Sequence, residues 1–236
     1  MATIEQKRAE ALKALPETRT ALATVKLPAP MLAGSVSVEQ ALNSRRSVRR
    51  YTPEPLSPAQ VSQLLWAAYG ITLPIPAGPG FLRGGMRTAP SAGALYPLEL
   101  YLVAGNVTGL EPGVWHYRSE TNELELIRKG DCREELCTPA VGQGGRNAPV
   151  VIGYSAIYER TTGKYGARGR DRYVCMDAGH SSENLCLQAV ALGLGTCAIG
   201  AFHDDEVRLC LGMTRSEVPL YLFPVGKPKG VPGTQE

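Results

Sequence analysis

The sequence predicts one α+β domain. Predicted strands and helices are interleaved along the chain, without the regular strand–helix alternation of a parallel doubly wound sheet. Of the 236 residues, 44% are hydrophobic and 20% are charged, and the 26 glycines and 18 prolines are spread along the chain. This composition excludes a disordered, collagen-like or coiled-coil protein, and a chain of this length can bury a substantial core.

Residues 1–34 are expected to form an N-terminal helix and a linker arm, and residues 35–236 the domain itself. Apolar residues recur at roughly helical spacing up to Leu15, directly before Pro16. This pattern predicts a short amphipathic helix over residues 4–15. The prolines that follow are typical of a linker that runs to about Gly34.

Two capping boxes open the domain. Ser37 and Ser57 are each followed three residues later by a glutamine, and Pro58 occupies the first helical position of the second box. In a capping box the serine and the glutamine each satisfy a backbone N–H at the start of a helix. Apolar residues at i, i+3, i+4 and i+7 continue the second helix. Gly70 stands where a left-handed cap would end it.

The remaining elements follow a Gly/Pro-rich loop over residues 73–85. Strands are predicted over residues 98–104, 114–117, 124–127, 149–156 and 218–225, with the second and third forming a hairpin. A helix is expected over residues 177–192, ended by Gly193. Asp204 or Asp205 is expected to cap a last short helix that runs through Leu211.

The net charge of +3 is too small to favour a nucleic-acid or membrane-surface protein. The chain has no run of about 18 apolar residues, and its charged N-terminus is unlike a signal peptide, so we expect a cytoplasmic protein. The six cysteines include no C-x-x-C pair and the three histidines no H-x-x-x-H pair. We therefore expect neither a disulfide framework nor a metal site.

A basic cluster follows the first capped helix of the domain. Arg45, Arg46, Arg49 and Arg50 surround Ser47. These arginines could offset the helix dipole in a solvated last turn. They could equally form an anion site, because guanidinium groups and a serine hydroxyl match the geometry of a phosphate.

Small residues and two prolines dominate residues 87–97. Such a backbone has little ability to form a regular strand ladder, and its small side chains allow close approach of a planar ligand. The other interpretation is a loop that enters the strand at Leu98.

Several stretches together resemble the nitroreductase family, and specifically its SagB-type dehydrogenase branch. They are RRSVRRYTPEPL, LLWAAYGIT, RTAPSAGALYPLELYLVAG, KYGARGRDRYV, DAGHSSENLCLQAVALGLGTCAIGAF and PVGKPK. The similarity covers about residues 35–229. It implies an FMN-binding α+β fold, a central, mainly antiparallel sheet flanked by helices, and an intertwined homodimer with two flavin sites at its interface.

The resemblance also assigns roles to individual residues. The FMN phosphate and ribityl chain would be held by Arg45, Arg46, Ser47, Arg49, Lys227 and Lys229. A strip that the partner subunit lays beside the isoalloxazine ring matches Pro90, Ser91, Ala92, Gly93 and Ala94. A turn whose backbone N–H faces flavin N5 matches Ile199, Gly200 and Ala201. Lys164 and Tyr165 match the pair that acts as catalytic acid and base in azoline-oxidising members, although their polar stretch also suits a surface loop.

The resemblance implies an FMN-dependent oxidoreductase that passes two electrons from NAD(P)H to a nitroaromatic, quinone or similar small-molecule acceptor. One alternative is a SagB-type dehydrogenase that oxidises an azoline or another organic substrate. Others are a flavin-binding module without turnover and an anion- or nucleic-acid-binding protein. The sequence leaves the donor and the acceptor open, because the flavin performs the hydride chemistry in either enzyme.

Overall fold

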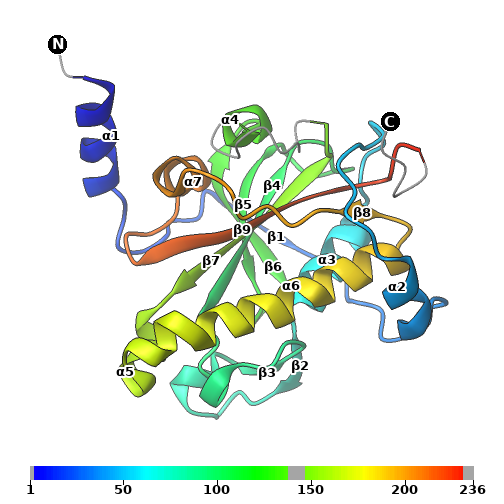
Figure 1. The fold of residues 1–236 in the computed structure, drawn as a ribbon, viewed down its shortest axis with the longest axis horizontal. Coiled ribbons are helices and arrows are strands. Elements are labelled where there is room, and N and C mark those ends of the chain that lie inside the picture. Colours follow the sequence, from blue (N-terminus) through cyan, green and yellow to red (C-terminus); the bar gives the residue numbers. More distant parts are fainter. Residues whose placement is uncertain (1–2, 138–146, 231–236) are drawn as a thin grey trace.

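The computed structural model describes residues 3–137 and 147–230. Within them an antiparallel seven-stranded sheet crosses the middle of the molecule, in the order β1-β6-β5-β4-β7-β9-β8 (Figure 1). The strands are β1 (Ala23–Lys26), β4 (Leu98–Ala104), β5 (Gly113–Arg118), β6 (Glu123–Lys129), β7 (Val150–Ile157), β8 (Gly195–Thr196) and β9 (Glu217–Gly226). A separate two-stranded sheet pairs β2 (Ile71–Pro74) with β3 (Gly85–Arg87).

Helices cover both faces of the large sheet, which confirms the predicted α+β architecture. The α-helices are α1 (Ile4–Lys13), α2 (Val38–Ser44), α3 (Pro58–Tyr69), α4 (Arg133–Cys137), α5 (Glu159–Tyr165), α6 (Val174–Ala191) and α7 (Asp204–Leu211). Short 3-10 turns form at Gly80–Leu82 and Ala92–Ala94, and a π-helical turn at Gly169–Tyr173 precedes α6. Helices α3 and α6 pack on one face of the sheet, and α4 and α7 lie on the other (Figure 1).

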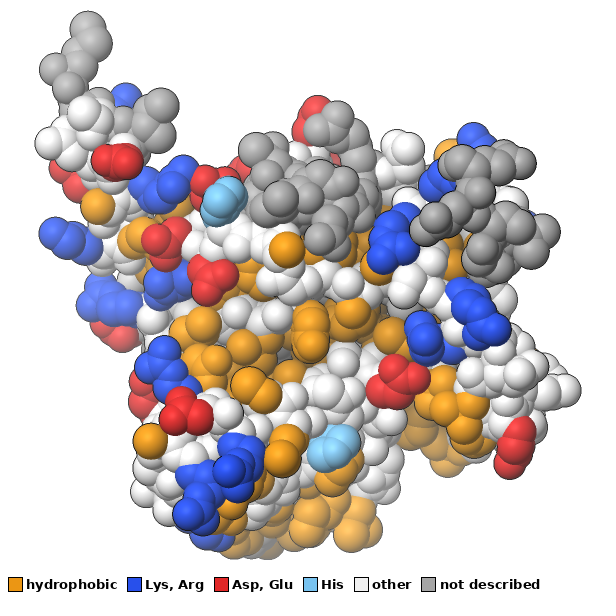
Figure 2. Space-filling view, in the orientation of Figure 1, with side chains coloured by type: hydrophobic (Ala, Val, Ile, Leu, Met, Phe, Trp, Pro, Cys, Tyr) orange, Lys and Arg blue, Asp and Glu red, His pale blue; other side chains and the backbone are white. Residues whose placement is uncertain are grey.

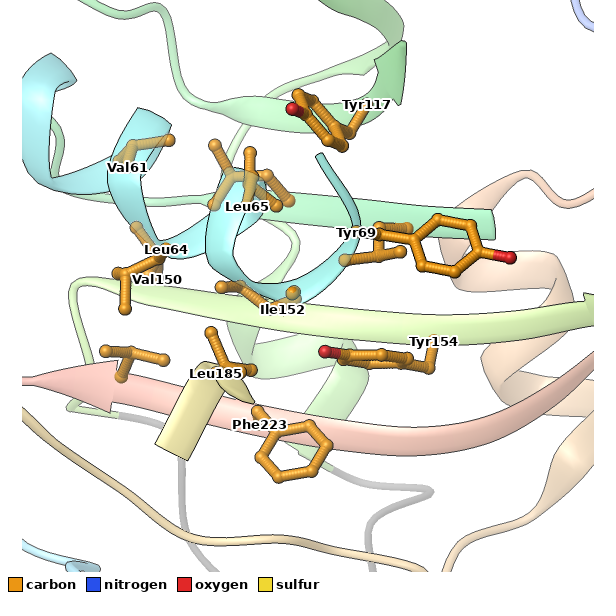
Figure 3. Close-up of a cluster of buried hydrophobic side chains, with 14 of the residues drawn as sticks. Val61, Leu64, Leu65, Tyr69, Tyr117, Val150, Ile152, Tyr154, Leu185 and Phe223 are labelled. Carbon is orange, nitrogen blue, oxygen red and sulfur yellow. The ribbon is translucent and has the colours of Figure 1, made fainter. Parts of the chain in front are cut away.

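The main core lies between the sheet and the α3–α6 pair. Figure 3 shows Leu64 and Leu65 of α3 and Leu185 of α6 pointing toward Ile152 of β7 and Phe223 of β9, and all five are at most 1% exposed. Each such side chain stabilises the fold by about 1.5–3 kcal/mol through burial alone. The well-packed sheet thus provides a rigid support for the segments that leave its strands.

Both capping boxes form as predicted. Ser37 Oγ accepts a hydrogen bond from the Gln40 N–H at 3.2 Å, and Gln40 Oε1 accepts one from the Ser37 N–H at 3.0 Å. The box at the start of α3 has the same two bonds. Gly70 differs from its prediction, because its backbone is extended, with φ −69°. A Cβ there would lie 2.2 Å from the Trp66 ring, so crowding requires the glycine, and the left-handed prediction was wrong.

Two segments carry more structure than their sequence indicates. The expected linker contains β1, which pairs with β6 and extends the sheet. The polar residues 159–173 form α5 and the π-helical turn, where a surface loop had been the alternative. Helix α7 begins after His203, so Asp204 and Asp205 lie in its first turn and neither caps it.

None of the described helices is both long and apolar enough to cross a bilayer. The cytoplasmic location stays a prediction.

Candidate functional site

The arginine segment, residues 45–52, lies in an extended stretch against two distant parts of the chain. The Thr52 N–H donates to the Lys227 carbonyl at 2.9 Å, and the Lys229 N–H donates to the Arg50 carbonyl at 3.0 Å. The segment also bridges to β8 through Ser47. The backbone therefore brings the predicted N-terminal and C-terminal halves of the phosphate site together.

Arg45 and Arg46 line a cavity of about 240 Å³ with Gly195 and Pro228. The Arg45 guanidinium lies 3.8 Å from the Glu183 carboxylate, and both side chains are well exposed. Arg46 donates to backbone carbonyls at the end of α2 and forms no ion pair with any described carboxylate. The arginines thus interact with the helix terminus and still present positive charge to the cavity, so both sequence interpretations stand.

Lys227 and Lys229 do not line this cavity. Lys227 Nζ binds both carboxylate oxygens of Glu54, at 3.0 and 2.9 Å. Lys229 lines a different cavity, of about 460 Å³, with Tyr51 and Arg133. The structure therefore joins the two lysines to Arg45 and Arg46 through their backbones and does not gather all four side chains around one cavity.

The 90–94 strip has an unusual backbone. Gly93 is left-handed, with φ 65°, and so are the non-glycine residues Ala94 at 55° and Tyr96 at 46°. A left-handed residue with a Cβ costs about 1–2 kcal/mol. Strain of this kind persists only where surrounding contacts impose it, and it concentrates at functional sites.

Asp177 holds the strip from α6. Its carboxylate accepts a hydrogen bond from Ser91 Oγ at 2.5 Å and one from the Ala92 N–H at 3.3 Å. Ser91 Oγ in turn accepts one from the Tyr96 N–H at 2.9 Å. Burial raises the pKa of the Asp177 carboxyl, and these bonds oppose that shift. One buried carboxylate thus fixes the turn that places Gly93.

Lys164 and Tyr165 form the last turn of α5 and lie against this strip. A Cβ on Gly93 would be 2.7 Å from the Tyr165 hydroxyl and 3.2 Å from Lys164 Nζ. The Tyr165 ring meets the Tyr173 ring edge to face, with centroids 4.9 Å apart. The structure therefore brings the predicted catalytic pair and the predicted flavin-facing strip together within one protomer.

The 199–201 turn lies on the edge of β9. Ile199 and Leu222 exchange two backbone hydrogen bonds, at 2.9 and 3.0 Å, which fix the start of the turn. Gly200 and Ala201 are exposed, and their N–H groups have no hydrogen-bond partner among the described residues. Both groups are free to donate to a ligand.

A buried charged cluster next to the strip was missed by sequence reasoning. Glu99 of β4 contacts Arg160 of α5 at 2.6 Å, Arg83 at 3.0 Å and His116 Nε2 at 2.6 Å. Burial would raise the pKa of Glu99, but Arg83 and His116 hold it well below its usual value. Arg160 lies one turn before Lys164, so the cluster anchors α5. The one sequence signal was a carboxylate inside the apolar run of β4.

Among residues 3–137 and 147–230, no three His, Cys, Asp or Glu side chains come together as a metal site would require. The expectation of no metal is not tested by this observation.

The chain and its fold are similar to those of known proteins. Residues 42–227 match the nitroreductase family. A protein of Methanocaldococcus jannaschii assigned as a nitroreductase is 42% identical over 193 residues, which is 81% of this chain and 91% of that protein. The microcin B17-processing protein of Escherichia coli is 27% identical over 146 residues, 59% of this chain and 52% of that protein.

A crystal structure from Anabaena variabilis, also assigned as a nitroreductase, superposes with a TM-score of 0.73 at 30% identity. The match covers 88% of this chain and 42% of that chain.

Proposed function

The chain belongs to the nitroreductase family, and we propose that it is an FMN-dependent oxidoreductase that passes two electrons from NAD(P)H to a nitroaromatic, quinone or similar acceptor. The observation that carries the proposal is the arginine segment. Its backbone is locked between β8 and residues 227–229, while Arg46 and Arg49 form no ion pair with a described carboxylate. Exposed, unpaired guanidinium groups on a fixed backbone suit a phosphate.

The residues present fit FMN. Arg45, Arg46 and Ser47 would hold the phosphate at the cavity that the two arginines line. The strip offers small side chains to a flat ring, and the free N–H groups of Gly200 and Ala201 are donors for a ring nitrogen. When bound, FMN would supply the ability to accept and release a hydride. We further propose a homodimer, in which the strip completes the flavin site of the partner subunit.

A second candidate function is oxidation of an organic substrate such as an azoline. The contact of Lys164 and Tyr165 with Gly93 favours it, because a substrate C–H oxidised at this strip would have a general base within reach. The likeness to the microcin B17-processing protein supports the same branch. A flavin-binding module without turnover is the remaining candidate.

An absorbance spectrum of the purified protein tests the proposal. We expect about one FMN per subunit, either as purified or after incubation with FMN. Arg45→Ala should weaken FMN binding by more than about 1.5 kcal/mol, the low end for a hydrogen bond to a charged group. Arg128→Ala is the matched control, because this exposed arginine pairs with Glu135 and is not part of the arginine segment. A protein that stays colourless with excess FMN would contradict the proposed function.

A further inference from the structure

Lysines and arginines without a carboxylate partner gather in three places in the described part of the chain. Most cations outside these places form ion pairs, for example Arg8 with Glu206 and Lys129 with Glu111. The unpaired ones are Lys7 and Lys13 on α1, Arg46, Arg49, Arg50 and Lys229 at the proposed phosphate site, and Lys164, Arg168, Arg170 and Arg172 around α5. We call this last group the α5 basic cluster.

The α5 basic cluster is a folded unit. The π-helical turn packs directly on α5, since a Cβ on Gly169 would lie 2.9 Å from the Thr161 carbonyl carbon. The Gly169 N–H donates to the Gly166 carbonyl at 2.9 Å, and the Tyr165–Tyr173 ring contact closes the far end. Figure 2 shows Lys and Arg side chains gathered on the end of the molecule where Figure 1 places α5.

Structural roles account for only part of this cluster. Lys164 in the last turn of α5 interacts favourably with the helix dipole, and Arg170 lies 5.2 Å from the centre of the Tyr158 ring. Arg168 and Arg172 have no such contact, and Asp171 forms no ion pair with any described cation. Exposed cations within nine residues of one another repel, so an anion that binds among them is stabilised.

The position of the cluster connects it to the reaction. Lys164 is both a member of the cluster and a neighbour of Gly93 in the strip. An anion at the α5 basic cluster would therefore lie next to the point where the reacting molecule meets the proposed catalytic pair. The phosphate of FMN has a different site, at the arginine segment.

We propose that the α5 basic cluster binds a carboxylate or phosphate of the molecule that reacts beside Lys164 and Tyr165. This inference rests on the proposed function and narrows its substrate class to anionic reaction partners. The anion is either a group on the oxidised or reduced substrate or a phosphate of the nicotinamide nucleotide. The chemistry that recognises it, guanidinium to anionic oxygen, is the same in both cases.

Two matched probe pairs test the inference on the FMN-loaded protein. The acceptors 4-nitrobenzoate and 4-nitrobenzyl alcohol share a nitroarene and differ in one negative charge. The donors NADPH and NADH differ in one phosphate. For each pair the readout is the ratio of kcat/KM for the more anionic probe to that for the other. We expect the double variant Arg168→Gln/Arg172→Gln to lower one ratio by about tenfold, the low end of electrostatic steering.

The probe pair whose kcat/KM ratio changes identifies the source of the anion. A lower acceptor ratio assigns the cluster to a substrate carboxylate, and a lower donor ratio assigns it to the nucleotide phosphate. Lys7→Gln/Lys13→Gln is the matched control, because it removes two unpaired cations from α1. If both ratios in the α5 variant equal those of the parent, or if the α1 variant lowers them as much, the inference is wrong.

Equilibrium dialysis separates this outcome from a failure of the proposed function. It compares the binding of 4-nitrobenzoate with that of 4-nitrobenzyl alcohol and, on protein without FMN, the binding of NADPH with that of NADH. A protein that takes up no FMN overturns the proposed function, yet its preference for the more anionic probe of each pair still reports on the cluster. If both preferences are equal in the parent and the α5 variant, the inference is overturned in that case as well.

Discussion

Gly93 leaves no room for a side chain beside Tyr165. A Cβ on Gly93 would lie 2.7 Å from the Tyr165 hydroxyl, closer than a real Cβ contact allows. The 90–94 strip and the end of α5 are thus fitted to one another at the scale of a single methyl group. Because Asp177 fixes the strip and Arg160 fixes the backbone of α5, a side chain on Gly93 would displace the ends of the Tyr165 and Lys164 side chains.

We predict that Gly93→Ala impairs activity more than its backbone strain alone explains. Gly109→Ala is the matched control, because Gly109 has a similar φ of 73° and nothing within 4 Å of its Cβ position. Both variants should lose about 1–2 kcal/mol of unfolding free energy from the left-handed alanine. Only Gly93→Ala should also displace Tyr165 and Lys164. Urea unfolding and kcat/KM, measured on both variants, check this expectation.

Equal loss of stability and equal activity in the two alanine variants would contradict the fit between the strip and α5.

The carboxylate of Glu99 holds together three arginines and a histidine. Arg83, Arg160 and His116 lie within 3.0 Å of it, and Arg19 lies 3.9 Å away. The folded protein lowers the pKa of Glu99, so its stabilising contribution is complete above the unfolded pKa of about 4.3. That contribution is lost as the pH falls through the folded pKa.

We predict that Glu99→Gln lowers the unfolding free energy by about 3–5 kcal/mol at neutral pH, because it removes the one described carboxylate that pairs with the partly buried Arg160. The difference from the parent should begin to shrink below about pH 4.3, where Glu99 of the unfolded parent takes up a proton, and it should continue to shrink until the pH falls through the lower pKa of the folded state. Glu17→Gln is the control, since Glu17 pairs with Arg215 at an exposed site and should change little. Denaturant unfolding from pH 3 to pH 8 tests this, and a pH-independent difference would refute it.

Local patterns in the sequence were sufficient for the elements whose stability is local. The capping boxes predicted α2 and α3, and the apolar runs predicted β4, β7 and β9. The resemblance to the nitroreductase family, based on motifs spread over the chain, is confirmed by the comparisons.

Elements that depend on tertiary contacts escaped prediction. Strand β1 is exposed along its whole length, so it has no apolar alternation to detect, and only its pairing with β6 creates it. Helix α5 is polar and is supported by Arg160 and by the packing of Gly169. Likewise, sequence order gave no sign that Lys227 would pair with Glu54. The roles assigned to the site residues stay predictions.

Lys164 distinguishes the two candidate reactions. In the oxidation of an organic substrate, a proton must leave the substrate as its hydride departs, and Lys164 beside the strip would accept that proton. A nicotinamide donor gives up a hydride without losing a proton, so its reaction needs no base. Removing the lysine should therefore slow the oxidation of an organic substrate and leave flavin reduction by the nicotinamide donor nearly unchanged.

We predict that Lys164→Ala, at matched flavin content and saturating nucleotide, changes the rate of flavin bleaching by NADPH or NADH by less than about threefold, since the variant removes no group that this hydride transfer needs. Lys13→Ala is the control, because Lys13 is also an unpaired lysine in the last turn of a helix. Stopped-flow absorbance measures the bleaching directly. The opposite outcome has two parts: neither nucleotide bleaches the flavin, and Lys164→Ala slows oxidation of an azoline by about 10²- to 10⁴-fold, the usual size of a general-base contribution. That outcome would assign the dehydrogenase function to this site. Bleaching could instead be rapid in the parent and in Lys13→Ala but lost in Lys164→Ala. That result would contradict both the reductase, in which Lys164 is not needed, and the dehydrogenase, in which Lys164 is the base, because flavin reduction by the nucleotide releases no proton.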